Sequence, residues 1–157
     1  MIDWHYELAL QQELERAEEQ MAAYLTARWD PFKESTPLKE GVEMSGLTPS
    51  QFSQLSTLAR ESEAVPVVIN YLRYQIGRSD KGKAWRWNDV GMTLVSTLER
   101  EMRTLAQQTA SRAAERIGAG RAEATPAQLQ AAWIAVAQRF LALLARRFEQ
   151  RYRDADV

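Results

Sequence analysis

The sequence predicts an all-α protein, a single domain of residues 1–157 built as a five-helix bundle. Apolar residues recur at steps of three and four along most of the chain, which is the period of an amphipathic helix. Helix start and stop signals separate these stretches, and no stretch convincingly reads as a strand. A chain of 157 residues also has the common size of one domain and is long enough to bury a core.

The first helix is expected over residues 3–29, where glutamates and glutamines cover the polar faces. Its apolar face is expected to hold Leu10, Leu14, Ala17, Met21 and Leu25. Asp30 and Pro31 then stop the helix. Residues 30–47 contain two prolines and two glycines, which predicts a long connector. A connector of this length is typical of a functional or mobile segment.

The second helix starts at residues 48–51, which read T-P-S-Q. The threonine caps this helix, the proline takes the first helical position and the glutamine reaches back to the cap. We expect the helix to end near Ser62 and a third helix to run from about Pro66 to Gly77, where glycine offers a left-handed stop. The stretch VPVVINYL is rich in β-branched residues, but its continuation at helical spacing favours a helix.

A fourth, longer helix is expected from Asn88, its cap, to Gly118. Residues 125–128 read T-P-A-Q and repeat the start signal of the second helix, so a fifth helix follows and reaches about Arg153. Shared capping chemistry explains the two similar starts better than an internal duplication does. The buried face of the fifth helix is expected to hold Leu129, Trp133, Val136, Phe140, Leu144 and Phe148.

The composition offers little for catalysis or metal binding. The chain has no cysteine and a single histidine, His5, so it lacks the several imidazoles or thiolates that a metal site needs. Acidic pairs such as Glu15 with Glu19 lie on a charged face typical of a solvated helix. Serine nucleophiles have no evident base partner. We therefore expect a protein that is not an enzyme, with no catalytic residue, no metal and no cofactor.

No apolar run approaches the roughly 20 residues of a membrane span, and the first residues, MIDWHYELAL, lack a basic flank and a signal-type apolar block. The absence of cysteine suits a reducing compartment. The sequence thus predicts a cytoplasmic protein without a membrane partner.

The net charge of −1 conceals an asymmetry between the two halves of the chain. Residues 1–63 hold 12 acids and 5 bases, a charge of −7, whereas residues 64–157 hold 9 acids and 15 bases, a charge of +6. Such a division is typical of a protein that binds nucleic acid on one side, or of copies that stack acidic end on basic end. The alternative is that the helices have differently charged solvated faces.

Residues 77–84, GRSDKGKA, match the spacing of a nucleotide-binding P-loop through Gly77, Gly82 and Lys83. Ala84 replaces the Ser or Thr whose hydroxyl holds magnesium in that motif. The preceding segment also reads as a helix, whereas a P-loop follows a parallel strand. These departures argue against nucleotide hydrolysis.

The same octet belongs to a basic, aromatic stretch over residues 71–87. Its cations are Arg73, Arg78, Lys81, Lys83 and Arg86, against one acid, Asp80, and its aromatic residues are Tyr71, Tyr74, Trp85 and Trp87. Cations neutralise phosphates and flat rings stack on exposed bases, a combination that suits RNA or single strands. At helical spacing, however, aromatic rings usually supply buried area, so we expect the tyrosines to pack in the core.

An L-T-x-S-Q helix start followed about 25 residues later by a helix ending L-x-Y-Q-x-G-R resembles the small helical subunit of type III CRISPR effector complexes. The matching residues are Leu47, Thr48, Ser50, Gln51, Leu72, Tyr74, Gln75, Gly77 and Arg78. The motifs cover about residues 46–83, and the remainder agrees only in its number of helices.

This resemblance implies a non-catalytic protein that lines the effector in several copies, stacked head to tail beside other effector subunits, and supports guide RNA and target RNA by backbone contact. It implies that Arg73, Arg78 and the following lysines lie along the RNA path, with Gln51 and Arg60 near it. The alternative function is a dimeric helical scaffold for protein–protein interaction without nucleic acid. The first helix suggests this alternative, because Trp4, Tyr6 and Leu8 are expected to form an exposed patch there.

Overall fold

The structure, a computed structural model, describes residues 4–28, 49–79, 88–118 and 123–155. These residues form helices and short connections, and no strand occurs among them. The helical segments are α1 (Trp4–Arg28), α3 (Pro49–Glu61), α4 (Val65–Ser79), α5 (Asn88–Glu99), α6 (Glu101–Arg116) and α7 (Pro126–Ala155). The prediction of an all-α helical bundle is confirmed. The expected connector over residues 30–47 lies outside the described residues.

The fourth expected helix is present but is interrupted at Arg100, between α5 and α6. Arg100 has φ −110° and ψ −75°, away from the regular helical values of about −63° and −42°. Backbone hydrogen bonds still cross the interruption, because the Arg100 N–H donates to the Ser96 carbonyl at 3.0 Å and the Thr104 N–H donates to the Arg100 carbonyl at 2.9 Å. The five expected helices are therefore recovered, with the fourth one locally distorted.

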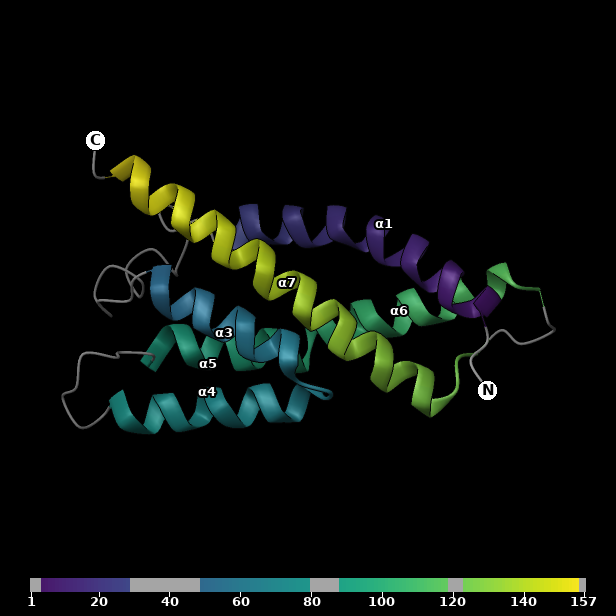
Figure 1. Ribbon diagram of the computed structural model, residues 1–157, viewed down its shortest axis with the longest axis horizontal. Helices are drawn as coiled ribbons and strands as arrows, with labels where there is room; N and C mark the ends of the chain where they lie inside the picture. The colour runs from purple at the N-terminus through teal and green to yellow at the C-terminus, as the bar shows by residue number, and fades with distance from the viewer. Residues whose placement is uncertain (1–3, 29–48, 80–87, 119–122, 156–157) are drawn as a thin grey trace.

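The longest helix, α7, crosses the bundle diagonally and organises it (Figure 1). It packs against α1 and α6 and also against α3. The remaining helix, α4, packs mainly against α5 and makes few contacts with α3 and α7, so it lies at the outer edge of the bundle (Figure 1). One face of α4 is consequently left without a helical neighbour among the described residues.

The core lies where the apolar stripes of these helices meet. The stripe expected for α1 is buried throughout, with Leu14, Met21 and Leu25 at most 1% exposed. On α7 the expected stripe from Trp133 to Phe148 is also buried, and only Leu129 is half-buried. Each large apolar side chain removed from water contributes about 1.5–3 kcal/mol, which makes these stripes the main stabilising feature.

Aromatic contacts join α7 to two of its neighbours. Phe148 of α7 lies against Phe52 of α3 with ring centroids 4.3 Å apart, and Phe140 meets Tyr24 of α1 edge-on at 6.1 Å. Such pairs stabilise by about 0.5–1.5 kcal/mol beyond the area they bury. They also fix which face of α7 is turned toward each neighbour.

The helix start predicted at residues 125–128 is formed as a reciprocal capping box. The Thr125 N–H donates to Gln128 Oε1 at 2.9 Å, and the Gln128 N–H donates to Thr125 Oγ1 at 3.1 Å. These two bonds satisfy backbone and side-chain groups that a bare helix end leaves unpaired. Gly118 ends the preceding helix with φ +62°, as expected of a glycine stop.

The expected stop at Gly77 is not found, because α4 continues through Gly77 to Ser79. Among the described glycines a positive φ occurs at Gly118, whereas Gly77 has an ordinary helical backbone. Glycine permits a left-handed stop but does not impose one, and the helix here continues by one more half-turn.

The end of α3 is satisfied by a side chain distant in the sequence. Nε2 of Gln138, on α7, donates to the carbonyl oxygens of Ala59 at 3.0 Å and Ser62 at 3.3 Å. Terminal carbonyls of a helix have no partner within it, so this amide both caps α3 and ties it to α7.

Within the described part of the chain, one stretch, Pro126–Gln150 of α7, is long and apolar enough to cross a membrane by length and composition alone. The core helix of a globular bundle has the same composition, and Trp133, Phe140 and Leu144 of this stretch are buried inside the protein. The absence of a membrane partner and the cytoplasmic location stay predictions.

Candidate nucleic-acid interface

The outer face of α4 is the part of the predicted basic stretch that the structure describes. Val67 and Tyr74 on this face are 53% and 61% exposed, and Asn70 between them is exposed as well. These residues are separated by steps of three and four, so they form one stripe along the helix. The opposite face of α4 is buried through Val68 and Leu72.

Tyr74 departs from the expectation that both tyrosines pack in the core. Its neighbour Tyr71 is half-buried against the core, as expected, but Tyr74 is 61% exposed because none of the described helices covers the outer edge of α4. The Arg78 guanidinium carbon lies 5.6 Å from the centre of the Tyr74 ring. One turn of helix thus holds a cation and an exposed aromatic ring together.

A hollow of about 540 Å³ adjoins this stripe where α3 approaches α4. Its lining residues are Leu58, Val67, Asn70, Tyr71 and Tyr74. Two aromatic rings and two aliphatic side chains give it apolar walls, and the Asn70 carboxamide supplies both hydrogen-bond donors and an acceptor. This combination suits a flat, partly polar group such as a nucleobase.

Arg73 lies on α4 beside this face, with its guanidinium paired to a carboxylate. Its Nη2 lies 3.2 Å from Oε1 of Glu99 on α5, and the two side chains are 58% and 44% exposed. Exposed pairs of this kind contribute about 0–1 kcal/mol. A phosphate that approaches Arg73 therefore competes with Glu99, which is a weak partner of Arg73 and also carries a negative charge.

The two other predicted contact residues that the structure describes, Gln51 and Arg60, are not gathered at this face. Gln51 is only 9% exposed at the start of α3, so its side chain is not presented at the surface. Arg60 is exposed near the end of α3, and its Nη2 donates a long hydrogen bond of 3.4 Å to Thr57. Lys81, Lys83 and Arg86 lie outside the described residues. Of the proposed cations, Arg73, Arg78 and Arg60 are placed by the structure.

The P-loop reading finds no structural support in the part of the octet that is described. Gly77 and Arg78 lie inside α4, which begins at Val65 and ends at Ser79. A phosphate-cradling loop needs its first glycine in a turn that leaves a strand. The element before Gly77 is a helix, as the sequence predicts.

The charge difference between the halves of the chain is partly balanced inside one molecule. Arg116 pairs with Glu13 at 3.1 Å, and Arg139 pairs with Glu18 while donating to Gln11 Oε1 at 2.9 Å. Both pairs join the acidic α1 to a basic helix of the second half. Part of the asymmetry therefore serves internal packing and is not available to a neighbouring copy.

Sequence reasoning did not assign Asn70, Val67 or Leu58 to this interface, and it expected Leu58 on the buried face of its helix. The available signal was the period of α4, since Val67, Asn70 and Tyr74 lie opposite the buried stripe. His5 is exposed in the first turn of α1. Among the described residues no group of three metal-ligating side chains comes together.

No family model matches this chain. No curated protein and no solved structure is significantly similar to it.

Proposed function

We propose that the protein is a non-catalytic RNA-binding subunit of an RNA-guided effector complex, and that it contacts RNA through the outer face of α4. The observation that carries this proposal is the exposed Tyr74 ring with the Arg78 guanidinium 5.6 Å from its centre. An aromatic face next to a cation is the arrangement with which proteins hold single-stranded nucleic acid, where the ring stacks on a base and the cation meets a phosphate.

Three side chains make the proposed contact, and each has a different role. Tyr74 stacks on an unpaired base, Arg78 neutralises the adjacent phosphate, and Arg73 supplies a second cation at the cost of its weak pair with Glu99. The loop cations Lys81, Lys83 and Arg86 extend the same basic stretch in the sequence. Nothing in this arrangement reads base identity strongly, which suits a subunit that supports RNA of any sequence.

The wider assignment rests on the motif resemblance at about residues 46–83. In that assignment the bound polymers are guide RNA and target RNA, the neighbours are other effector subunits and further copies of this chain stacked head to tail, and the location is the cytoplasm.

Fluorescence anisotropy with a labelled single-stranded RNA tests the proposal. The logarithm of the association constant is expected to fall with the logarithm of salt concentration by about 0.7 per neutralised phosphate, or about 3 in total for four contacts. Arg78→Ala should reduce this slope by about one contact. Tyr74→Ala should weaken binding by about 1–3 kcal/mol and leave the slope unchanged, because stacking releases no counterion.

Two further variants sharpen the test. Glu99→Gln should strengthen RNA binding, because it frees Arg73 and removes a negative charge from the RNA path. Arg112→Ala removes an exposed arginine of α6 and serves as the matched control. Equal losses for Arg78→Ala and Arg112→Ala would show diffuse attraction without an interface on α4, and a flat salt response would contradict the proposal altogether.

A second function, the dimeric scaffold, is favoured by the first turns of α1. Trp4 and Leu8 are 72% and 62% exposed and lie one turn apart on the same face, whereas Tyr6, also expected in this patch, is buried at 3%. Light scattering distinguishes the two functions. A constant dimer that Trp4→Ser converts to a monomer, with no response to RNA, supports the scaffold. Assembly that grows with RNA length supports the RNA-binding subunit.

A further inference from the structure

A small hollow lies between α6 and the beginning of α7, on helices other than those that form the α4 interface. It has a volume of about 210 Å³. Its lining residues are Arg103, Gln107, Pro126, Leu129, Gln130 and Trp133. No carboxylate is among these described residues, so Arg103 is the charged residue of this lining.

Arg103 is held in place by an aromatic platform. Its guanidinium carbon lies 5.1 Å from the centre of the Trp133 ring. That ring is only 8% exposed and is fixed by a 2.9 Å hydrogen bond from its Nε1–H to the Leu98 carbonyl. A guanidinium stacked on a ring keeps its N–H donors in its own plane, where they remain able to bind an anion in a forked manner.

The donors of Arg103 have no internal acceptor in the described part of the protein. The ion pairs there join Arg16, Arg73, Arg116 and Arg139 to carboxylates, and none includes Arg103. Glu99, one turn before Arg103 on the same chain segment, is paired with Arg73. Arg103 is therefore positioned by its contact with the Trp133 ring and not by a counter-ion among the described residues.

Two carboxamides converge on the same space. Gln107 follows Arg103 by one turn of α6, and Gln130 lies one turn before Trp133 on α7, so both face the hollow. Each amide adds two N–H donors to the five of the guanidinium. A carboxylate holds its two oxygens in one plane, whereas the oxygens of a phosphate monoester or diester are arranged tetrahedrally around phosphorus and match donors that arrive from two helices.

We propose that this hollow, formed by Arg103, Gln107, Gln130 and Trp133, is a phosphate-binding site. Arg103 provides the forked, charge-assisted hydrogen bonds, the two glutamines bind the remaining oxygens, and Trp133 holds Arg103 in place. The phosphate belongs either to a free monoester, such as a nucleotide, or to a diester of a nucleic-acid backbone. The site does not depend on RNA binding at α4, and either proposal can fail alone.

The test is a titration of the ¹⁵N-labelled full chain followed by NMR at the indole N–H of Trp133, which Trp133→Phe assigns by loss of the signal. Inorganic phosphate, dimethyl phosphate and acetate are added separately at constant ionic strength. Inorganic phosphate is expected to shift this signal saturably, and acetate is expected not to. A higher affinity for inorganic phosphate than for dimethyl phosphate indicates a monoester. An equal or higher affinity for dimethyl phosphate indicates a backbone diester.

Arg103→Ala is expected to weaken phosphate binding at least tenfold, equivalent to about 1.4 kcal/mol. Arg112→Ala, on the same helix and also exposed, is the matched control and should bind as the unmodified protein does. Arg103→Ala replaces an exposed residue, and an unchanged circular dichroism melting curve verifies that it folds. Absence of a saturable shift, equal binding of acetate, or unchanged affinity in Arg103→Ala would each overturn the proposal.

Discussion

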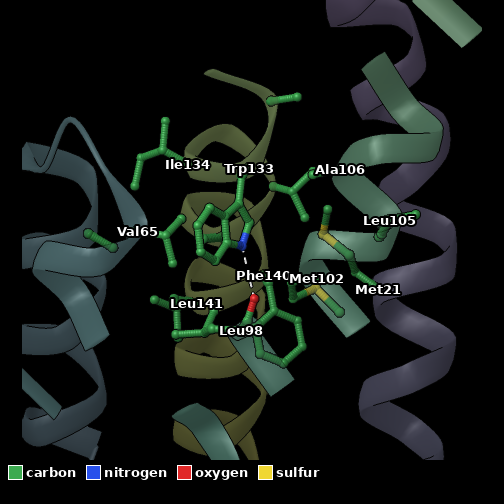
Figure 2. Close-up of a cluster of buried hydrophobic side chains, with 14 of the residues drawn as sticks. Met21, Val65, Leu98, Met102, Leu105, Ala106, Trp133, Ile134, Phe140 and Leu141 are labelled. Carbon is green, nitrogen blue, oxygen red and sulfur yellow. Dashed lines mark hydrogen bonds between the residues drawn. The ribbon is translucent and has the colours of Figure 1, made fainter. Parts of the chain in front are cut away.

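The indole Nε1–H of Trp133 on α7 donates a 2.9 Å hydrogen bond to the carbonyl oxygen of Leu98 on α5 (Figure 2). Leu98 precedes by two residues the point where the helix is interrupted at Arg100. Helices bend where a side chain enters their ladder of backbone hydrogen bonds. We attribute the interruption between α5 and α6 to this indole, which lies in the core beside Met102, Ala106 and Leu141 (Figure 2).

Trp133→Phe keeps a buried ring and removes the donor, so the Leu98 carbonyl loses its indole partner. The free energy of unfolding is expected to fall by about 1–2 kcal/mol, measured by urea denaturation followed by circular dichroism. Trp4→Phe changes an indole that is 72% exposed and should leave the midpoint unchanged. Equal midpoints for the two variants would show that the bond to Leu98 does not stabilise the fold.

Arg116→Ala removes the nearer cation of a buried carboxylate. Glu13 is 3% exposed, with Nη1 of Arg116 at 3.1 Å and Nη1 of Arg16 at 3.7 Å from its Oε1. Its other oxygen has no hydrogen-bond partner among the described residues, so Arg116 is its principal compensation. The free energy of unfolding should fall by about 2 kcal/mol, because a charged acceptor loses its partner while it remains buried.

The control for this loss is Arg112→Ala, an exposed residue of the same helix, which should change stability by less than about 0.5 kcal/mol. Adding Glu13→Gln to Arg116→Ala should recover part of the loss, since the buried charge is gone. A double variant no more stable than Arg116→Ala would argue against this electrostatic cause.

Replacing glycine by alanine is expected to change the stability of the protein in opposite directions at Gly77 and Gly118. Gly77 has ordinary helical backbone in α4, and a Cβ there would meet no atom within 4 Å, so Gly77→Ala should stabilise the protein by about 0.4–1 kcal/mol. Gly118 has φ +62°, and Gly118→Ala should destabilise it by about 1 kcal/mol despite equally open space. Thermal unfolding measures both changes. Shifts of the same sign would contradict the assigned backbone conformations.

Tyr6 makes stability depend on pH in the alkaline range. Burial, and secondarily the negative charge of Glu7, raises the pKa of Tyr6 from 10.0 to about 12. Between these values the folded state keeps a proton that the unfolded state has lost, so Tyr6 contributes stability below pH 10 that disappears as pH rises toward 12. This shift in pKa limits the loss in the free energy of unfolding to at most about 3 kcal/mol.

Urea unfolding at pH 9 and pH 11.5 checks this dependence. The unmodified protein should lose more stability over this interval than Tyr6→Phe, which has no phenol to ionise at this position. Tyr74→Phe removes an exposed phenol and is the matched control, expected to follow the unmodified protein. An equal decline in Tyr6→Phe and the unmodified protein would assign the effect to other groups.

The sequence by itself determined the helices and their buried faces. The three-and-four spacing predicts the core residues of α1 and α7, and the capping residues Thr125 and Gln128 predict where α7 begins. These features depend on residues a few positions apart, so local geometry is sufficient to specify them. Gly118 was predictable for the same reason, whereas Gly77 shows that a permissive residue does not by itself decide a boundary.

Only the tertiary structure decided which polar and aromatic groups find partners. Gln138 caps α3 across 79 residues of sequence, and Trp133 reaches a carbonyl on another helix. The exposure of Tyr74 follows from the position of α4 at the edge of the bundle. A helical period marks the apolar face of a helix but does not state how many neighbours cover the others, because that depends on how distant segments pack.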